Sequence, residues 1–195
     1  MSASEALEAL AADADFYKAS GGGITLSGGE PLMQADFARE IVMLCRARGL
    51  KTCIETSCFA PWESFEAVLT YTDLFLCDWK LTDDAQHLRC VGQSNALIRE
   101  NILKLDAAGA KLRLRCPIIP DVNDTSEHFR GIAELANSLR RVGRVEIMPY
   151  HNAWTAKCDT YSLEAPPAFQ VPTAREIEAW IDEIKRYTDV EVRKG

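Results

Sequence analysis

Five short apolar segments of the sequence each end in, or carry, polar residues that could bind a small ligand. These polar groups are Ser27-Gly28-Gly29-Glu30, Glu55-Thr56-Ser57, Asp78-Trp79-Lys80, the pair Arg113 and Arg115, and Tyr150-His151. Carboxylate and carbonyl oxygens accept hydrogen bonds from an ammonium group, guanidinium and ammonium groups bind a carboxylate, and imidazole pairs with hydroxyls. The residue types therefore predict a site for a zwitterionic, amino-acid-like ligand.

The elements that would position these residues alternate along the whole chain, which predicts an α/β fold. Strands are expected over residues 24–27, 51–56, 73–80, 111–119, 144–150 and 189–193. A helix is expected over residues 4–14, capped by Ser4. Four more helices are expected where apolar residues recur at helical spacing: one stops at Gly49, one stops at Gly109, one includes Leu139 and one includes Ile184. Since single helices separate these strands, each crossover returns a strand parallel to its predecessor.

Side-chain alternation predicts which residues share a face of the sheet. Period 2 places Asp78 and Lys80 on one face and Trp79 on the other. It also places Arg113 and Arg115 on a face that lines a lumen or cleft, because the apolar residues between them need the face that the helices cover. The continuous apolar run over residues 74–77 predicts a strand buried on both faces.

Each polar group also has a purely structural explanation when it is considered alone. Gly28-Gly29 fits a tight turn, Asp78 and Lys80 fit a structural ion pair, the two arginines fit a solvated edge strand, and His151 fits a hydrated loop. Ligands of parallel α/β folds bind at the C-terminal ends of the strands. The arrival of all these groups at one such edge favours a common binding site.

Composition narrows the class of protein. The chain has 195 residues, 47% hydrophobic and 26% charged, with a net charge of -7, so one soluble domain over residues 1–195 is expected. The acidic balance argues against a nucleic-acid partner, and no apolar run reaches the length of a membrane helix. The start of the chain lacks the basic region of a signal peptide, and the seven cysteines suggest buried, reduced thiols. We therefore predict a cytoplasmic protein without a membrane partner.

One longer motif resembles a known family. The run Asp13-x-x-Phe16-Tyr17-x-x-Ser20-Gly21-Gly22-Gly23-Ile24-Thr25-Leu26-Ser27-Gly28-Gly29-Glu30-Pro31-Leu32 is similar to that of the radical S-adenosylmethionine (SAM) activating enzymes of glycyl radical enzymes. Glu55-Thr56, Asp78-Trp79-Lys80, Arg115 and Met148-Pro149-Tyr150-His151 follow in the order of that family. The resemblance implies a partial (β/α) barrel of parallel strands that binds SAM.

The resemblance also implies residue roles. Ser27, Gly28, Gly29 and Glu30 would hold the amino group of SAM, Asp78 and Lys80 would bind its amino-acid end, and His151 would contact the nucleoside. Glu55 and Thr56 would lie near the carboxylate, where a monovalent cation can sit, and Arg115 would lie toward the substrate peptide. Lys80, Asp78 and Arg115 are the expected catalytic residues. The sequence departs from the family at Glu55, usually Asp, and at Ser57-Cys58, often Asn-Gly.

The family binds a [4Fe-4S] cluster through a C-x-x-x-C-x-x-C loop that follows its first strand. The 195 residues contain no such motif, and the spacing of Cys53 and Cys58 does not replace it. We therefore expect a chain that lacks the first strand and the cluster loop, is inactive alone and contains no metal site for the cluster. The complete enzyme would cleave SAM reductively and remove a hydrogen atom from a glycine Cα of a partner glycyl radical enzyme, with flavodoxin or ferredoxin as electron donor.

Two other interpretations stay open at this point. The chain could be an inactive, truncated scaffold or binding domain. Lys80 at a strand end beside Asp78 also resembles the Schiff-base lysine of barrel lyases.

Overall fold

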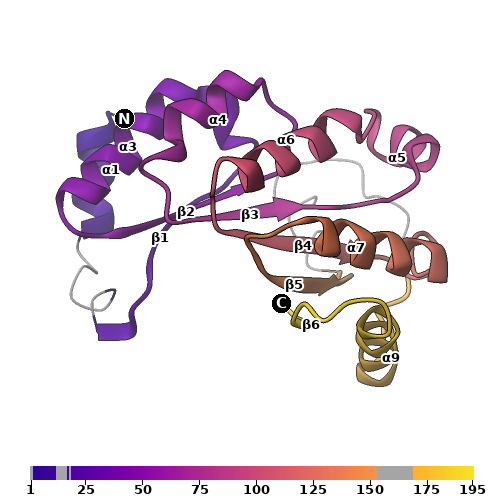
Figure 1. The fold of residues 1–195 in the computed structure, drawn as a ribbon. Helices are drawn as coiled ribbons and strands as arrows, with labels where there is room; N and C mark the ends of the chain where they lie inside the picture. Colours follow the sequence, from indigo (N-terminus) through magenta and orange to yellow (C-terminus); the bar gives the residue numbers. More distant parts are fainter. Residues whose placement is uncertain (1, 12–16, 18, 153–168) are drawn as a thin grey trace. The chain divides into compact units, whose positions relative to one another are not determined.

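The computed structural model describes residues 2–11, 17, 19–152 and 169–195 and shows an α/β fold (Figure 1). Its strands are β1 (Gly23–Leu26), β2 (Lys51–Thr56), β3 (Leu74–Asp78), β4 (Leu112–Ile118), β5 (Val142–Pro149) and β6 (Val192–Lys194). Its helices are α1 (Ala3–Ala11), η1 (Pro31–Gln34), α3 (Ala35–Ala47), α4 (Trp62–Leu69), α5 (Asp84–Val91), α6 (Ala96–Ala107), α7 (Ser126–Ser138) and α9 (Ala174–Lys185). The strands follow one another in the sheet in sequence order, and the pairs β1–β2, β2–β3 and β5–β6 are parallel. The predicted fold class is confirmed.

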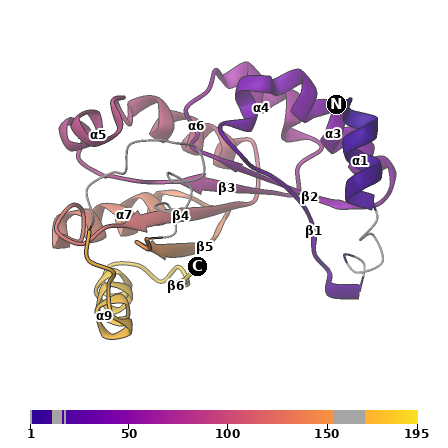
Figure 2. The same ribbon diagram turned by 180° about the vertical axis from the view of Figure 1, so that it is seen from behind.

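The chain divides into two compact units, which we describe separately. The first contains residues 1–78 and 94–113, and the second contains residues 79–93 and 114–195. In the first unit α3 packs against α1, α4 and β2, as the two opposite views show (Figures 1 and 2). Its N-terminal core consists of Ala3, Leu7, Ile24, Ile41, Cys45 and Leu50. In the second unit α9 packs against α7 and β6, with Phe129 and Trp180 in ring contact.

Local signals explain where several elements begin. The first helix is capped by Ser2 rather than by the predicted Ser4: the Ser2 hydroxyl accepts from Glu5 N, and Ser2 N donates to the Glu5 carboxylate. At β1, a Cβ on Gly23 would lie 2.3 Å from the carbonyl oxygen of Lys51, its register partner. Only glycine therefore allows β1 to approach the first residue of β2 so closely.

The predicted alternation holds along β3 and β4. Trp79 is buried between half-buried Asp78 and Lys80, and half-buried Arg113 and Arg115 alternate with buried apolar residues. The prediction that residues 74–77 are buried on both faces is wrong. Phe75 and Cys77 are fully buried, but Leu74 and Leu76 are only half-buried because they lie on the same face as the charged side chains of β3 and β4.

Some elements gave no sequence signal that we recognised. The helices α4 and α5 are only eight residues long, and η1 is a single turn, so periodicity is weak in each of them. Two helices, α5 and α6, connect β3 to β4 where a single helix was expected. Residues 152–172 form the longest stretch of the sequence without periodicity, for which a surface loop is expected, and they lie largely outside the described residues. No helix in the described ranges is long and apolar enough to cross a membrane.

Candidate functional site

The segment after β1 contains two glycines with different backbone requirements. Gly28 has a φ of +125°, a conformation that other residues rarely adopt. Gly29 has no positive φ, and a Cβ placed on it would meet no atom within 4 Å. The fold therefore requires glycine at position 28, whereas at position 29 the absence of a side chain leaves open space beside the backbone.

Glu30 follows these glycines and is fixed by the loop after β2. Its Oε1 accepts from the Thr56 hydroxyl at 2.8 Å and from Leu32 N at 3.2 Å, which caps η1. Its Oε2 accepts from Ser57 N at 2.8 Å and from the Ser57 hydroxyl at 2.5 Å. Each carboxylate oxygen thus accepts from one backbone N–H and one hydroxyl, and the four bonds fix the orientation of the carboxylate.

This arrangement limits how Glu30 can receive a ligand. An ionised carboxylate offers about four lone-pair positions, and the chain's own donors point at all of them. The two backbone N–H groups are fixed, but the hydroxyls of Thr56 and Ser57 can rotate. An ammonium group that reaches Glu30 would exchange with one of these hydroxyls.

A buried thiol lies close to both Glu30 and Asp78, at the C-terminal ends of β1, β2 and β3. Burial raises the pKa of Cys58 well above its usual range, and the neighbouring thiol of Cys77 and the carboxylates of Glu30 and Asp78 raise it further. In the first unit the charges of Glu30 and Asp78 thus both act on this thiol, whereas a binding site that Glu30 and Asp78 share stays a prediction. Glu55, the penultimate residue of β2, is half-buried and also interacts with neighbouring groups.

The cysteines do not all match the prediction of buried thiols. The six described cysteines are free, and four of them are buried: Cys45, Cys58, Cys77 and Cys116. Cys90 is exposed on the short helix α5, and Cys53 is half-buried, where burial raises its pKa to about 11. Cys158 lies outside the described residues.

The second unit contains Lys80, Arg115 and His151. Asn123, which is buried, donates from Nδ2 to the carbonyl oxygens of Lys80 at 2.9 Å and Pro117 at 2.8 Å. It fixes the main chain that carries Lys80. Arg115 contacts the sulfur of Met148 at 3.8 Å, and His151 is exposed just after β5. The convergence of these three residues with Glu30 and Asp78 stays a prediction.

A second anchor holds the main chain two residues after Lys80. Thr82 N donates to Nδ1 of His128 at 3.2 Å, and the Thr82 hydroxyl lies 2.9 Å from the same nitrogen. His128 is 4% exposed, and its Nε2 has no hydrogen-bond partner among the described residues. Because Nδ1 accepts from a backbone N–H, the ring proton resides on Nε2. The segment after β3 therefore rests on the first turn of α7.

We predict that Gly131→Ala loosens this contact. A Cβ on Gly131 would lie 2.2 Å from Cγ2 and 2.4 Å from Oγ1 of Thr82, so the loop must move and stability should fall by about 2 kcal/mol. Urea unfolding measures the loss. The same substitution in a Thr82→Ala background should cost less, because both of those atoms are gone. If Gly131→Ala lowers the stability equally in both backgrounds, the contact between residue 131 and the Thr82 side chain is contradicted.

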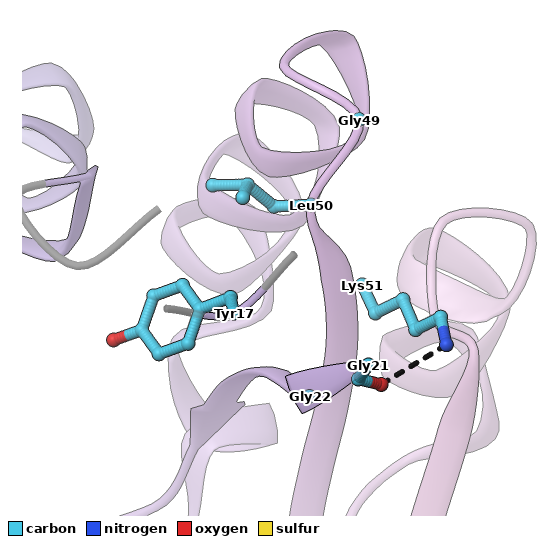
Figure 3. A pocket seen from close by; sticks show the side chains of 6 residues that line it. All are labelled: Tyr17, Gly21, Gly22, Gly49, Leu50 and Lys51. Carbon is cyan, nitrogen blue, oxygen red and sulfur yellow. Dashed lines mark hydrogen bonds between the residues drawn. The ribbon is translucent and has the colours of Figure 1, made fainter. Parts of the chain in front are cut away.

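A small pocket of about 120 Å³ lies at the other end of β1 and β2 (Figure 3). Tyr17, Leu50 and the Gly21-Gly22 turn line it, and Lys51 Nζ donates to the carbonyl oxygen of Gly21 at 3.0 Å. Lys51 thereby stabilises the turn that leads into β1. None of the residues predicted to bind the ligand lines this pocket.

Comparison with known proteins decides the family. A family model of the Radical SAM superfamily matches residues 2–136, which is more than half of the chain. The chain belongs to the radical SAM superfamily. Within this superfamily it is a member of the activating enzymes of glycyl radical enzymes, a family of enzymes, as its relatives show.

One relative is the pyruvate formate-lyase-activating enzyme of Clostridium pasteurianum, 30% identical over 94% of this chain and 79% of that protein. The (2S)-3-sulfopropanediol dehydratase activating enzyme of Klebsiella oxytoca is 40% identical over 76% of this chain and 48% of its own length. The choline trimethylamine-lyase activating enzyme of Oleidesulfovibrio alaskensis and the trans-4-hydroxy-L-proline dehydratase activating enzyme of Clostridioides difficile are matched over 60% and 57% of their lengths. The chain therefore spans about half to three fifths of three of these four relatives.

The fold of this radical SAM protein also matches solved structures. A crystal structure of a domain of the pyruvate-formate lyase-activating enzyme from Bacteroides vulgatus has a TM-score of 0.74 and 26% identity. The match covers 89% of this chain and 99% of that domain. The expected radical SAM type of α/β fold is therefore confirmed.

The described residues do not fit an iron–sulfur cluster. Among them no group of three or more His, Cys, Asp or Glu side chains could hold a metal ion. The adjacent thiols of Cys58 and Cys77 are both fully buried. We assign no residue of the described chain to a cluster and no reaction step to one.

Proposed function

We propose that this chain forms the SAM-binding part of an enzyme that activates a glycyl radical enzyme. The observation that carries the proposal is the Glu30 carboxylate, which the loop after β2 holds at the end of β1 beside an open glycine backbone. A fixed carboxylate next to accessible carbonyl groups suits the ammonium group of an amino acid. SAM carries such a group, and when bound it supplies the adenosyl group that the family's radical chemistry uses.

The proposal assigns the predicted residues as follows. Ser27, Gly28, Gly29 and Glu30 bind the amino group, Asp78 and Lys80 bind the amino-acid end, and Glu55 and Thr56 lie near the carboxylate with a monovalent cation. His151 contacts the nucleoside, and Arg115 faces the substrate peptide. The family membership and the order of these residues along the strands support these roles.

The activity of the complete protein is part of the proposal. In complete form, with a [4Fe-4S] cluster bound outside the described residues, it would cleave SAM and abstract a hydrogen atom from a glycine of its partner. The named relatives are activating enzymes of lyases and dehydratases, which supports a glycyl radical enzyme as the partner. The 195 residues alone are proposed to bind SAM without turning it over.

Calorimetric titration of the chain with SAM tests the proposal. We expect the wild-type chain to bind, and Gly29→Val to weaken binding about tenfold or more because the new side chain occupies the open space beside the backbone. Thermal unfolding should be unchanged in this variant, since no atom lies within 4 Å of the new Cβ. Lys80→Ala should also weaken binding.

Absence of binding by the wild-type chain, or binding unaffected by both substitutions, would contradict the proposed function. Reduction with borohydride in the presence of aldehydes and ketones tests the competing lyase interpretation. Covalent trapping on Lys80 would favour the lyase.

A further inference from the structure

The loop after β2 is fixed from a distant helix by one buried amide. Asn101 on α6 is fully buried, and its Nδ2 donates to the carbonyl oxygens of Cys58 at 3.0 Å and Ala60 at 2.9 Å. Its Oδ1 has no hydrogen-bond partner among the residues that the structure describes. The side chain therefore contributes through its NH2 group alone, and both N–H bonds of that group hold the loop.

The loop needs this support because its conformation is strained. Cys58 has a φ of +60°, in the left-handed region that costs a residue other than glycine or asparagine about 1 kcal/mol or more. In this conformation Cys58 N donates to the Thr56 hydroxyl oxygen at 2.9 Å. Phe59 N likewise donates to the Ser57 hydroxyl oxygen at 3.3 Å. In this backbone conformation the N–H groups of residues 58 and 59 thus donate to the hydroxyl oxygens of Thr56 and Ser57.

These amides set the direction of the hydroxyl protons. A hydroxyl has one proton and two lone pairs, so a hydroxyl oxygen that accepts from an amide turns its proton elsewhere. For Thr56 and Ser57 the remaining partner is the Glu30 carboxylate, at 2.8 and 2.5 Å. In the ligand-free chain the backbone conformation of residues 57–60 therefore favours the orientation in which both hydroxyls donate to Glu30.

We propose that Asn101 is a positioning residue for recognition of the ligand's ammonium group. Asn101 holds the carbonyl groups of Cys58 and Ala60. The backbone N–H groups of Cys58 and Phe59 therefore stay in place to donate to the hydroxyl oxygens of Thr56 and Ser57. The hydroxyls in turn hold the Glu30 carboxylate in its orientation. The ligand part of this inference rests on the proposed function, whereas the control of the loop by Asn101 does not.

Two substitutions of Asn101 separate this role from general packing. Asn101→Leu keeps the number and branching of the side-chain atoms and removes the two donors together with the unpaired oxygen. Asn101→Ala removes the same polar groups without adding methyl groups. Ile102→Val, at the adjacent buried position of α6, is the matched control because it weakens the core without removing a hydrogen-bond donor.

The first measurement uses SAM and an analogue in which hydrogen replaces the amino group, both titrated into the 195-residue chain. We expect Asn101→Leu to weaken SAM about tenfold, the value of one charge-assisted hydrogen bond, and to leave the affinity for the analogue nearly unchanged. Ile102→Val should change neither affinity. Equal losses for both ligands would overturn the inference and leave the proposed function standing.

The second measurement is amide hydrogen exchange of the ligand-free chain. Asn101→Leu should speed exchange at Ser57 and Cys58 about tenfold or more, with Ile54 in the centre of β2 unaffected. Asn101→Ala should act in the same direction if Asn101→Leu fails to fold. Unchanged exchange at Ser57 and Cys58 would overturn the positioning role. If the wild-type chain binds neither ligand, the proposed function fails, and the exchange result alone decides the role of Asn101.

Discussion

Replacement of Glu30 by Gln is expected to destabilise the first unit by about 3 kcal/mol, although the change adds no bulk. Each carboxylate oxygen of Glu30 accepts from one backbone N–H, that of Leu32 or that of Ser57. A glutamine has only one oxygen, so in either orientation its NH2 group faces one of these N–H groups. The hydroxyls of Thr56 and Ser57 can turn to accept, but a backbone N–H cannot.

Urea unfolding of the Glu30→Gln chain measures this loss, and SAM titration should show weakened binding in the same variant. Glu66→Gln is the matched control, because Glu66 is exposed on α4 and such surface changes usually stay within about 0.5 kcal/mol. A Glu30→Gln chain as stable as the control would show that the four hydrogen bonds contribute nothing to folding.

The sequence predicts the strands well because their signal is local. The segments that form β2, β3 and β4 are short and separated by amphipathic stretches. Alternation predicted Trp79 on the face opposite to Asp78 and Lys80, and in the structure Trp79 is buried between two half-buried charged residues. The glycines were also informative, since Gly28 has the positive φ of a turn. Short elements such as α5 were missed because eight residues give barely two helical turns.

The sequence did not predict the residues that hold the loops of the site, Asn101 and His128, because they come from distant parts of the chain. Asn101 reaches a loop more than forty residues earlier, and His128 reaches Thr82 across a similar separation. A signal was nevertheless present. Asn101 lies three residues after Ile98 and four before Leu105, on the apolar face of its helix, where a polar side chain must find a buried partner. His128 lies likewise on the apolar face of α7, four residues before Ile132.

The buried polar residues Asn101 and His128 act in the same physical way. Each lies in a helix and pairs with backbone groups just after a predicted ligand-binding residue. Asn101 acts on the loop that follows Thr56, and His128 acts on the segment that follows Lys80. Apolar side chains could fill the same volumes but could not pair with those backbone groups. Packing alone would leave the loops free to shift, whereas hydrogen bonds fix their register.

The stability of the second unit is expected to fall in acid because of His128. Burial lowers the pKa of His128 from 6.5 to about 4, so the folded chain keeps the ring neutral in the range where the unfolded chain protonates it. The stabilising contribution is complete above pH 6.5 and is lost progressively as the pH falls toward 4. At about 1.4 kcal/mol for each pKa unit, the loss reaches about 3 kcal/mol.

Urea unfolding as a function of pH, compared between the wild-type chain and His128→Asn, isolates this effect. The asparagine oxygen can accept from Thr82 N in place of Nδ1 and does not titrate, so the variant should lose stability less steeply between pH 7 and 4. Asp83, Asp84 and Glu127 line the same cavity, but they are common to both chains, so their contributions cancel in the difference. Parallel pH profiles would mean that His128 is protonated in the folded chain, and the Thr82 amide would then have lost its acceptor.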